Sequence, residues 1–119
     1  MVVDRQKSMT PGPRYHASAS LRIAICEALP EPMHAGTREI INLRCANPRK
    51  GHATALMAEV CLEADKASIV LITQPGQFDD GMTTEQLTKW YGRMGFVALP
   101  HEPDMPQLMA RQVVKLEKV

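Results

Sequence analysis

The spacing of hydrophobic positions predicts two strands near the start of the chain. Apolar residues alternate with polar or small ones from Leu21 to Cys26 and again over residues 38–46, which is the period of a strand with one buried face. We expect the second strand to carry Ile41, Leu43 and Cys45 on one face and Ile40, Asn42 and Arg44 on the other. Residues 30–36 contain proline and glycine, so the two strands are expected to form an antiparallel hairpin with a seven-residue connection.

The period changes to that of a helix after Gly51. Apolar residues then recur three and four positions apart, which predicts an amphipathic helix facing a core. The stripe consists of Ala53, Leu56, Met57, Val60, Cys61 and Ala64. The nearly continuous apolar run over residues 68–73 follows it and suits a strand buried on both faces. Strand, helix and strand together predict a right-handed crossover unit.

A second helix is predicted from its end signals. Thr83 followed by Gln86 three residues later is a capping-box pattern, and Gly95 is a residue that suits a helix end. The face between these signals carries Leu87, Trp90, Tyr91 and Met94.

Short strands at residues 96–99 and 108–114 complete the predicted order, β-β-α-β-α-β-β, which is that of an α/β (α+β) fold with two main helices. Residues 1–19 include Thr10-Pro11-Gly12-Pro13 and little that is apolar. We therefore expect a flexible or irregular arm over 1–19, followed by one domain over 20–119.

Composition and charge exclude several classes of function. The chain has 119 residues, 45% hydrophobic and 23% charged, as in an ordinary single globular domain. Fourteen Lys and Arg against thirteen Asp and Glu give a net charge of +1, which disfavours a nucleic-acid partner or an acidic membrane surface. A nucleic-acid patch formed by Arg38, Arg44, Arg49 and Lys50 is therefore the least favoured reading. No apolar run approaches the roughly 18–20 residues that cross a bilayer, so no membrane partner is expected.

The cysteines and histidines predict neither disulfides nor a metal site. Three cysteines are widely spaced and form no Cys-x-x-Cys pair, and the four histidines are equally scattered. Free cysteines and the absence of a secretory signal favour the cytoplasm.

The segment between the second strand and the first helix is a candidate anion site. The sequence Pro48-Arg49-Lys50-Gly51 leads into the first turn of a helix, where backbone N–H groups lack internal partners. Such a turn suits a phosphate or pyrophosphate group. The alternative is a basic turn whose glycine merely permits the bend. The segment is neither a Walker loop nor Gly-x-Gly-x-x-Gly.

A second motif gives the first one a family context. The later helix ends in Tyr91-Gly92-Arg93-Met94-Gly95-Phe96, a Tyr-x-x-x-Gly-Phe pattern. The two motifs, about 40 residues apart with a strand between them, together resemble the GCN5-related N-acetyltransferase (GNAT) family. That family transfers acetyl from acetyl-CoA to an amine. The resemblance covers residues 39–111 and implies a mixed, mostly antiparallel sheet, acetyl-CoA as cosubstrate, and no metal.

The resemblance also implies residue roles. The amides of Gly51, His52, Ala53, Thr54 and Ala55 would bind the CoA pyrophosphate beside Arg49 and Lys50, and Leu43, Cys45 and Ala46 would lie along the pantetheine arm. Tyr91 would protonate the departing thiolate, unless it only packs in the core beside Trp90. Glu39 would act as general base, unless it is a salt-bridged strand residue.

The chain also departs from the family pattern. Pro48 stands where the family has Gln or Arg, and the N-terminal strand and helix pair of the family are absent or reduced to residues 1–37. The acceptor cleft is then open, supplied by the second copy of a homodimer, or completed by a large substrate. This favours a macromolecular amine such as a protein lysine. The alternative is a non-catalytic CoA-binding or protein-interaction module on the same scaffold.

Overall fold

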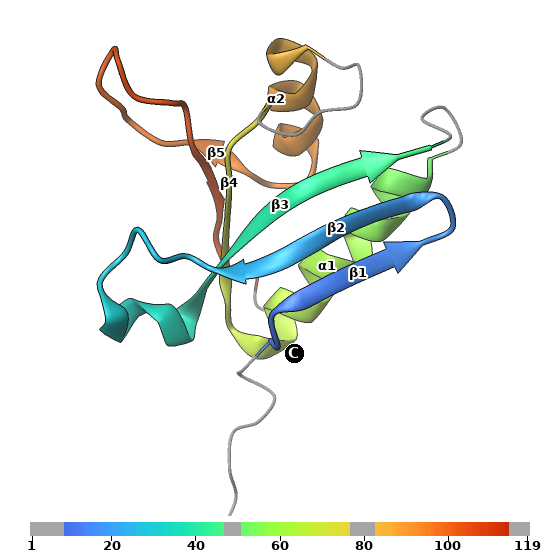
Figure 1. Cartoon of the computed structure of the whole chain (residues 1–119), viewed down its shortest axis with the longest axis horizontal. Coiled ribbons are helices and arrows are strands. Elements are labelled where there is room, and N and C mark those ends of the chain that lie inside the picture. Colours follow the sequence, from blue (N-terminus) through green and yellow to red (C-terminus); the bar gives the residue numbers. More distant parts are fainter. Residues whose placement is uncertain (1–8, 47–50, 77–82, 115–119) are drawn as a thin grey trace, which may run out of the picture.

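Six strands of the chain pair into one mixed sheet (Figure 1). The computed structural model describes residues 9–46, 51–76 and 83–114. The strands are β1 (Gly12–His16), β2 (Ala19–Ile25), β3 (Thr37–Cys45), β4 (Val70–Thr73), β5 (Val97–Ala98) and β6 (Met109–Arg111), in the sheet order β1-β2-β3-β4-β6-β5. Only β3 and β4 are parallel, and the other neighbours are antiparallel. The helices are α1 (His52–Ala67), α2 (Thr84–Arg93) and the short 3-10 helix η2 (Glu31–Gly36). The mixed, mostly antiparallel sheet with two main helices is confirmed.

The segment expected to be irregular, residues 1–19, contains a strand and a core residue. Within it, Gly12–His16 form β1, which pairs antiparallel with β2, and the Met9 side chain is buried. Two of the three inward positions of β1 are polar: Arg14 donates to the Glu63 carboxylate at 2.8 and 3.0 Å, and His16 Nδ1 lies 2.8 Å from Glu59 Oε2. Since ion pairs with α1 replace apolar contacts here, the strand has no hydrophobic alternation to detect.

A bulge in β3 changes the expected alternation of its side chains. Asn42 has a left-handed φ of +59°, and the pairing of β3 with β2 shifts by one residue at this point. An extra residue reverses the faces of all that follow it. Ile40 therefore shares the core side with Leu43 and Cys45, and the expectation that Ile41 would do so is wrong.

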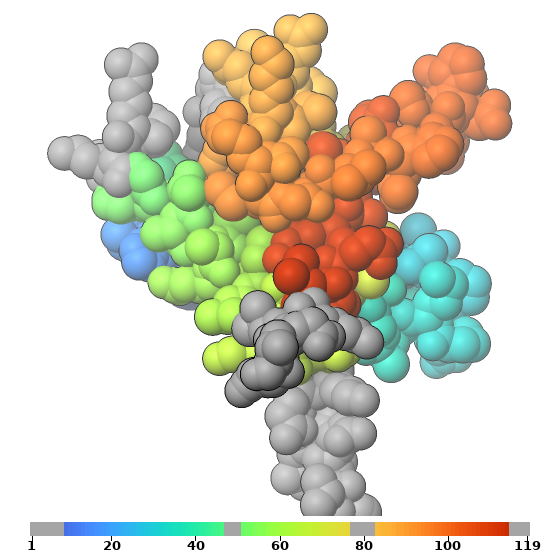
Figure 2. All heavy atoms as spheres, turned by 180° about the vertical axis from the view of Figure 1, so that it is seen from behind, coloured from blue at the N-terminus to red at the C-terminus, as the bar shows by residue number. Residues whose placement is uncertain are grey.

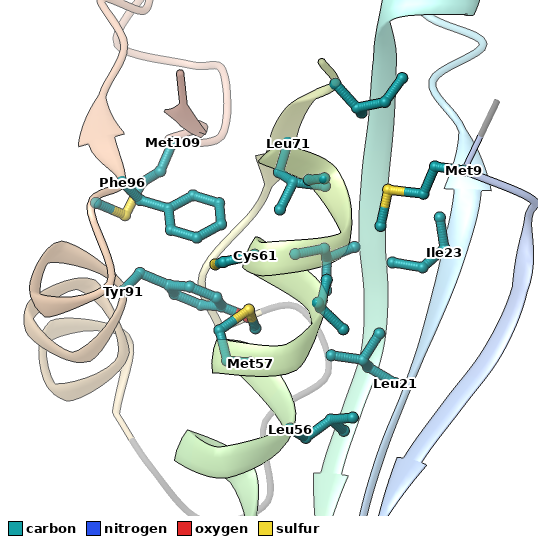
Figure 3. Close-up of a cluster of buried hydrophobic side chains, with 14 of the residues drawn as sticks. Met9, Leu21, Ile23, Leu56, Met57, Cys61, Leu71, Tyr91, Phe96 and Met109 are labelled. Carbon is teal, nitrogen blue, oxygen red and sulfur yellow. The ribbon is translucent and has the colours of Figure 1, made fainter. Parts of the chain in front are cut away.

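The core lies between the sheet and the two helices, as Figure 3 shows. The predicted stripe of α1 is confirmed, because Leu56, Met57, Val60, Cys61 and Ala64 are buried and Ala53 packs against them. Leu87, Trp90 and Tyr91 of α2 are also buried, and the predicted capping box is present. The α2 helix ends at Arg93 with Met94 as its C-cap, and Gly95 follows with a left-handed φ of +100°. Figure 2 shows the molecule from behind, where α1 covers this side of the sheet and residues 99–108 project from the body.

Three strands differ in detail from the predicted ones. In β4, Leu71 and Thr73 are buried while Val70 and Ile72 are half-buried, so burial alternates along the strand. The last two strands are shorter than the predicted segments 96–99 and 108–114. The β5 strand has two residues, both exposed, and it pairs with β6 through these two residues at this edge of the sheet.

A buried ion pair joins α1 to β6. The Arg111 guanidinium donates to both Asp65 carboxylate oxygens, at 2.8 and 3.0 Å, and each side chain is only about 10% exposed. Arg111 Nε also donates to the Met94 carbonyl at the end of α2, and the Val114 N–H donates to Asp65. The Arg111 side chain thus connects both helices to β6, the strand next to the β5 edge of the sheet.

Candidate functional site

The two parallel strands at the centre of the sheet separate part-way along their length. Their pairing runs from Thr37 opposite Val70 to Ile40 opposite Thr73. Beyond Ile40, β3 continues to Cys45 beside β2 alone, and the bulge at Asn42 lies at the point of separation. Bulges bend the strand that contains them. In the described part of the chain, the edge of β3 facing α2 therefore has no paired strand from Ile41 onwards.

A narrow cleft fills the space between the separated strands. It is lined by residues 40–43 of β3, by Thr73 and Gln74 at the end of β4, and by Leu87 and Tyr91 of α2. One wall is a strand edge, whose N–H and C=O groups can pair with the amides of an extended ligand. The other wall presents a phenol. An extended, amide-containing chain that paired with this strand edge would lie next to the phenol of Tyr91.

Tyr91 packs in the core, which is one of the two roles considered for it, and it also lines the cleft. The ring makes edge-to-face contacts with Trp90 and Phe96, at centroid distances of 5.0 and 5.2 Å. The hydroxyl lies 3.5 Å from Thr73 Oγ1. Burial raises the pKa of Tyr91, and the Thr73 hydrogen bond only partly offsets this. The phenol therefore keeps its proton at neutral pH, as a proton donor must.

Glu39 lies on the opposite face of the sheet from Tyr91. It is one residue before the last β3–β4 pair, opposite Ala24 of β2 and Ile72 of β4, while Ile40 beside it points into the core. The carboxyl is half-buried, and burial raises its pKa. No ion pair of Glu39 occurs among residues 9–46, 51–76 and 83–114. Glu39 lines a different, open hollow on that face, together with Arg22 and Glu27, so the structure does not bring it into the cleft of Tyr91.

The start of α1 is the candidate anion site. Gly51 is the N-cap residue with a left-handed φ of +77°, and no side chain of the described residues caps the helix there. A Cβ added at Gly51 would meet no atom within 4 Å, so space is open around it. The first N–H groups of a helix attract anions under these conditions. The basic residues expected beside them, Arg49 and Lys50, lie outside the described residues, as does Pro48.

A serine missed by the sequence analysis ties this helix start to the sheet. The Ser18 N–H donates to His52 Nδ1 at 3.3 Å, and Ser18 Oγ lies 2.6 Å from the same nitrogen. Because a backbone N–H can only donate, Nδ1 is an acceptor and the neutral ring has its proton on Nε2. The Ser18 backbone carbonyl also accepts from the Ala46 N–H at 3.0 Å, and the Ser18 hydroxyl lies 3.6 Å from Cys45 Sγ. The β1–β2 turn thus holds both the end of β3 and the start of α1. No local sequence signal marks this contact.

The remaining predicted site residues divide between these two regions. Leu43 lines the cleft and, like Cys45, packs against the core, whereas Ala46 is exposed just after the strand. In the first turn of α1, Ala53 and Ala55 are half-buried. Thr54 accepts a 3.0 Å hydrogen bond from Trp90 Nε1, which connects the start of α1 to α2.

Three further features bear on other classes of function. Arg38, considered for a nucleic-acid patch, is buried and donates to the backbone carbonyls of Met9, His34 and Thr37. Within the described ranges, no three His, Cys, Asp or Glu side chains gather as a metal site would require. In the same ranges, no helix is long and apolar enough to cross a membrane.

Solved structures share this arrangement of strands and helices. A putative acetyltransferase of the GNAT family from Desulfovibrio desulfuricans is 19% identical, with a TM-score of 0.57, covering 82% of this chain and 62% of that one. An acyl-CoA N-acyltransferase from Pseudomonas aeruginosa is 24% identical, with a TM-score of 0.51, covering 78% of this chain and 59% of that one. This chain has the GNAT fold. It spans about 60% of the length of these two proteins.

A third solved structure with the same fold is similar over nearly its whole length. The anti-CRISPR protein AcrVA5 is 17% identical, with a TM-score of 0.65, and the match covers 86% of this chain and 98% of that one. No protein-family model and no curated protein matches the chain by sequence. The GNAT fold of this chain is therefore established by structural similarity, and it agrees with the fold that the two sequence motifs imply.

Proposed function

We propose that this protein is an acetyl-CoA-dependent N-acetyltransferase whose acceptor is a primary amine on a protein. The proposal rests on the cleft between the separated ends of β3 and β4. This cleft combines a strand edge that pairs with no described strand directly beyond Ile40 with the protonated Tyr91, and β3 leads within a few residues to the start of α1, which no described side chain caps. A GNAT fold with these three features is suited to an extended thioester with an anionic end.

In the proposed complex, the two ends of acetyl-CoA bind to two different parts of the chain. The amides of the pantetheine arm pair with the edge of β3 along Leu43 and Cys45, where no strand of the described chain competes. The pyrophosphate binds the first N–H groups of α1, from Gly51 to Ala55, with Arg49 and Lys50 beside it. The Ser18–His52 contact holds these two parts of the site in a fixed relation.

The proposed reaction is direct transfer. The amine nitrogen attacks the thioester carbonyl carbon, so a C–N bond forms and the C–S bond breaks. Backbone donors at the strand edge stabilise the negative charge that develops on the carbonyl oxygen. The CoA sulfur takes a proton from the Tyr91 hydroxyl as it leaves. Binding both reactants in one cleft supplies proximity and orientation.

Glu39 is proposed to accept the proton that the amine loses, directly or through a water molecule. Its raised pKa makes it a better base than an exposed carboxylate. It lies next to the point where the strands separate, on the face opposite the Tyr91 side. An amine approaching from that face would pass Glu39 before it reached the cleft.

Binding of acetyl-CoA is the first test of the proposal. At a concentration 100 times its dissociation constant, acetyl-CoA should raise the free energy of unfolding by about 2.7 kcal/mol. Thermal unfolding with and without acetyl-CoA measures this, and acetate at the same concentration is the control. If millimolar acetyl-CoA left the transition unchanged, both acetyl transfer and CoA binding would be excluded.

Ser18→Ala is expected to weaken acetyl-CoA binding about fivefold, because loss of a hydrogen bond of this kind costs about 1 kcal/mol and leaves only the backbone contacts of residue 18 between the start of α1 and the end of β3. Ser20→Ala is the matched control, since Ser20 lies two residues later in β2 and the His52 contact is unaffected. Titration calorimetry with acetyl-CoA measures both variants. Equal affinity of the two variants would show that the Ser18 contact does not position the site.

A second candidate function is a non-catalytic CoA-binding or protein-interaction module. It is favoured by the similarity to AcrVA5, which covers nearly the whole of both chains and whose activity is described as anti-CRISPR. Release of free thiol from acetyl-CoA separates the two functions, with a panel of proteins and peptides as acceptors. An enzyme releases thiol in proportion to acetylated product, whereas a module is stabilised by acetyl-CoA without releasing any.

A further inference from the structure

The face of the sheet that points away from α1 is open along β1, β2 and β3. In Figure 1, these strands lie in front and α1 lies behind them, and no helix of the described chain covers the near side. The outward residues confirm this: Arg22 and Arg44 are exposed, and Tyr15 is 70% exposed. The positions between them, such as Leu21 and Ile23, are buried against α1. We call this side the outer face.

Charge on the outer face is arranged along the direction of β3. The cross-strand pairs place Arg44 in one row, Arg22 beside Ile41 in the next, and Glu39 beside Ala24 in the third. Rows of one face lie two residues apart, which is about 6.6–6.8 Å along a strand. The Glu39 carboxylate therefore lies where β3 and β4 separate, and the guanidinium groups of Arg22 and Arg44 lie farther along, toward the Cys45 end of β3.

The cationic part of the outer face adjoins the proposed active site at Asn42. An open hollow runs between Tyr15, Arg22 and Arg44, and Asn42 at the bulge forms part of its wall. Asn42 also lines the cleft that contains Tyr91. A second hollow joins Arg22 to Glu39 and Glu27 on the same face. A molecule lying on the outer face can thus contact Glu39 and also Asn42, which forms part of the cleft wall.

We infer that the outer face binds the acceptor protein, and that it selects a lysine flanked by aspartate or glutamate residues. This inference rests on the proposed acetyltransferase function. The ammonium group of the acceptor is attracted to Glu39, beside the point where β3 and β4 separate, and the flanking carboxylates are attracted to Arg22 and Arg44. A lysine with basic neighbours places like charges against the two arginines, which is unfavourable.

Charge reversal on the outer face tests this directly. The acceptors are two blocked peptides with one central lysine, flanked on each side by two glutamates in one peptide and by two arginines in the other. The wild-type protein should acetylate the glutamate peptide with a kcat/KM about tenfold or more above that for the arginine peptide, and the ratio should fall as salt screens the charges. In the double variant Arg22→Glu and Arg44→Glu, the preference should reverse.

The matched control is the double variant Lys66→Glu and Arg93→Glu. Both residues are exposed on the helices and away from the outer face, and the change in net charge is the same. This variant should keep the preference of the wild type. The acetyl-CoA-induced shift in thermal unfolding shows that each variant is folded and binds its cosubstrate.

The outcomes separate this inference from the proposed function. Equal kcat/KM for the two peptides, or a preference that survives reversal of Arg22 and Arg44, would overturn the inference while leaving the acetyltransferase intact. Absence of both acetyl-CoA binding and acetylation would instead contradict the proposed function. A preference that reverses only in the outer-face variant supports docking of an acidic acceptor.

Discussion

Replacing Tyr91 with phenylalanine should lower kcat for acetyl transfer about 100-fold or more, because a positioned general acid contributes about 10²–10⁴-fold to rate. The ring would keep its packing against Trp90 and Phe96, and only a long 3.5 Å contact to Thr73 would be lost. The free energy of unfolding should therefore change by about 1 kcal/mol or less. Continuous measurement of thiol release and thermal unfolding of the same samples give both quantities.

Thr88→Ala is the matched control for this variant. It also removes a hydroxyl from α2, but that hydroxyl donates to the Thr84 carbonyl within the helix and lies outside the cleft. Its kcat should match that of the wild type. If Tyr91→Phe also retained wild-type kcat, Tyr91 would be a core residue only, and the thiolate would have to be protonated by another group or by solvent.

Replacing Arg111 with methionine should lower the free energy of unfolding by about 3–5 kcal/mol at neutral pH, the usual cost of removing one partner of a buried ion pair. The methionine keeps much of the packing volume but leaves the Asp65 carboxylate, about 10% exposed, without its counter-charge. It also removes the hydrogen bond to the Met94 carbonyl at the end of α2. Urea unfolding at several pH values measures the loss.

The pH dependence of this loss follows from the pKa of Asp65. Burial alone would raise that pKa, but hydrogen bonds from Arg111 and Val114 and the charge of Arg111 outweigh burial and hold it below its ordinary value of 3.8. The folded wild type therefore binds this proton less readily than the unfolded chain. Its contribution to stability is complete above pH 3.8 and is lost as the pH falls through the folded-state value. The difference between wild type and Arg111→Met should shrink over that range, because Asp65 is then protonated in both.

A more exposed pair provides the control for Arg111. Glu63→Gln removes the partner of Arg14, and these side chains are 38% and 22% exposed. Its cost should be about 1 kcal/mol or less, since solvent screens the pair. A loss at Arg111 no larger than that at Glu63, or one that stayed constant down to pH 3, would contradict the role given to the buried pair.

The parts of the fold that follow local rules were predictable from sequence. The stripe of α1, the capping box of Thr83 and Gln86, and the helix end at Gly95 each depend on residues within a few positions of one another. The alternation of β2 is equally local. The spacing of two short motifs, with the resemblance they carry, gave the correct fold.

The parts that were missed depend on contacts between distant residues. Strand β1 has polar side chains at inward positions, and these are accommodated because carboxylates of α1 lie opposite them. The bulge at Asn42 changes which residues of β3 face the core, although asparagine does not by itself require a left-handed conformation. Ser18 reaches His52 across 34 positions of sequence, which no local pattern records.

The sequence by itself therefore determined the order of the helices and main strands, the two motifs, and the candidates Tyr91 and Glu39, because periodicity, caps and motif spacing act over short distances. Only the tertiary structure decided that β3 and β4 separate after Ile40 and that Tyr91 and Glu39 lie on opposite faces of the sheet. It also decided that the hollow beside the outer-face arginines shares Asn42 with the cleft. These relations follow from strand register and from one bulge. Register is fixed by the packing of whole strands against α1, so it exists only once the chain has folded.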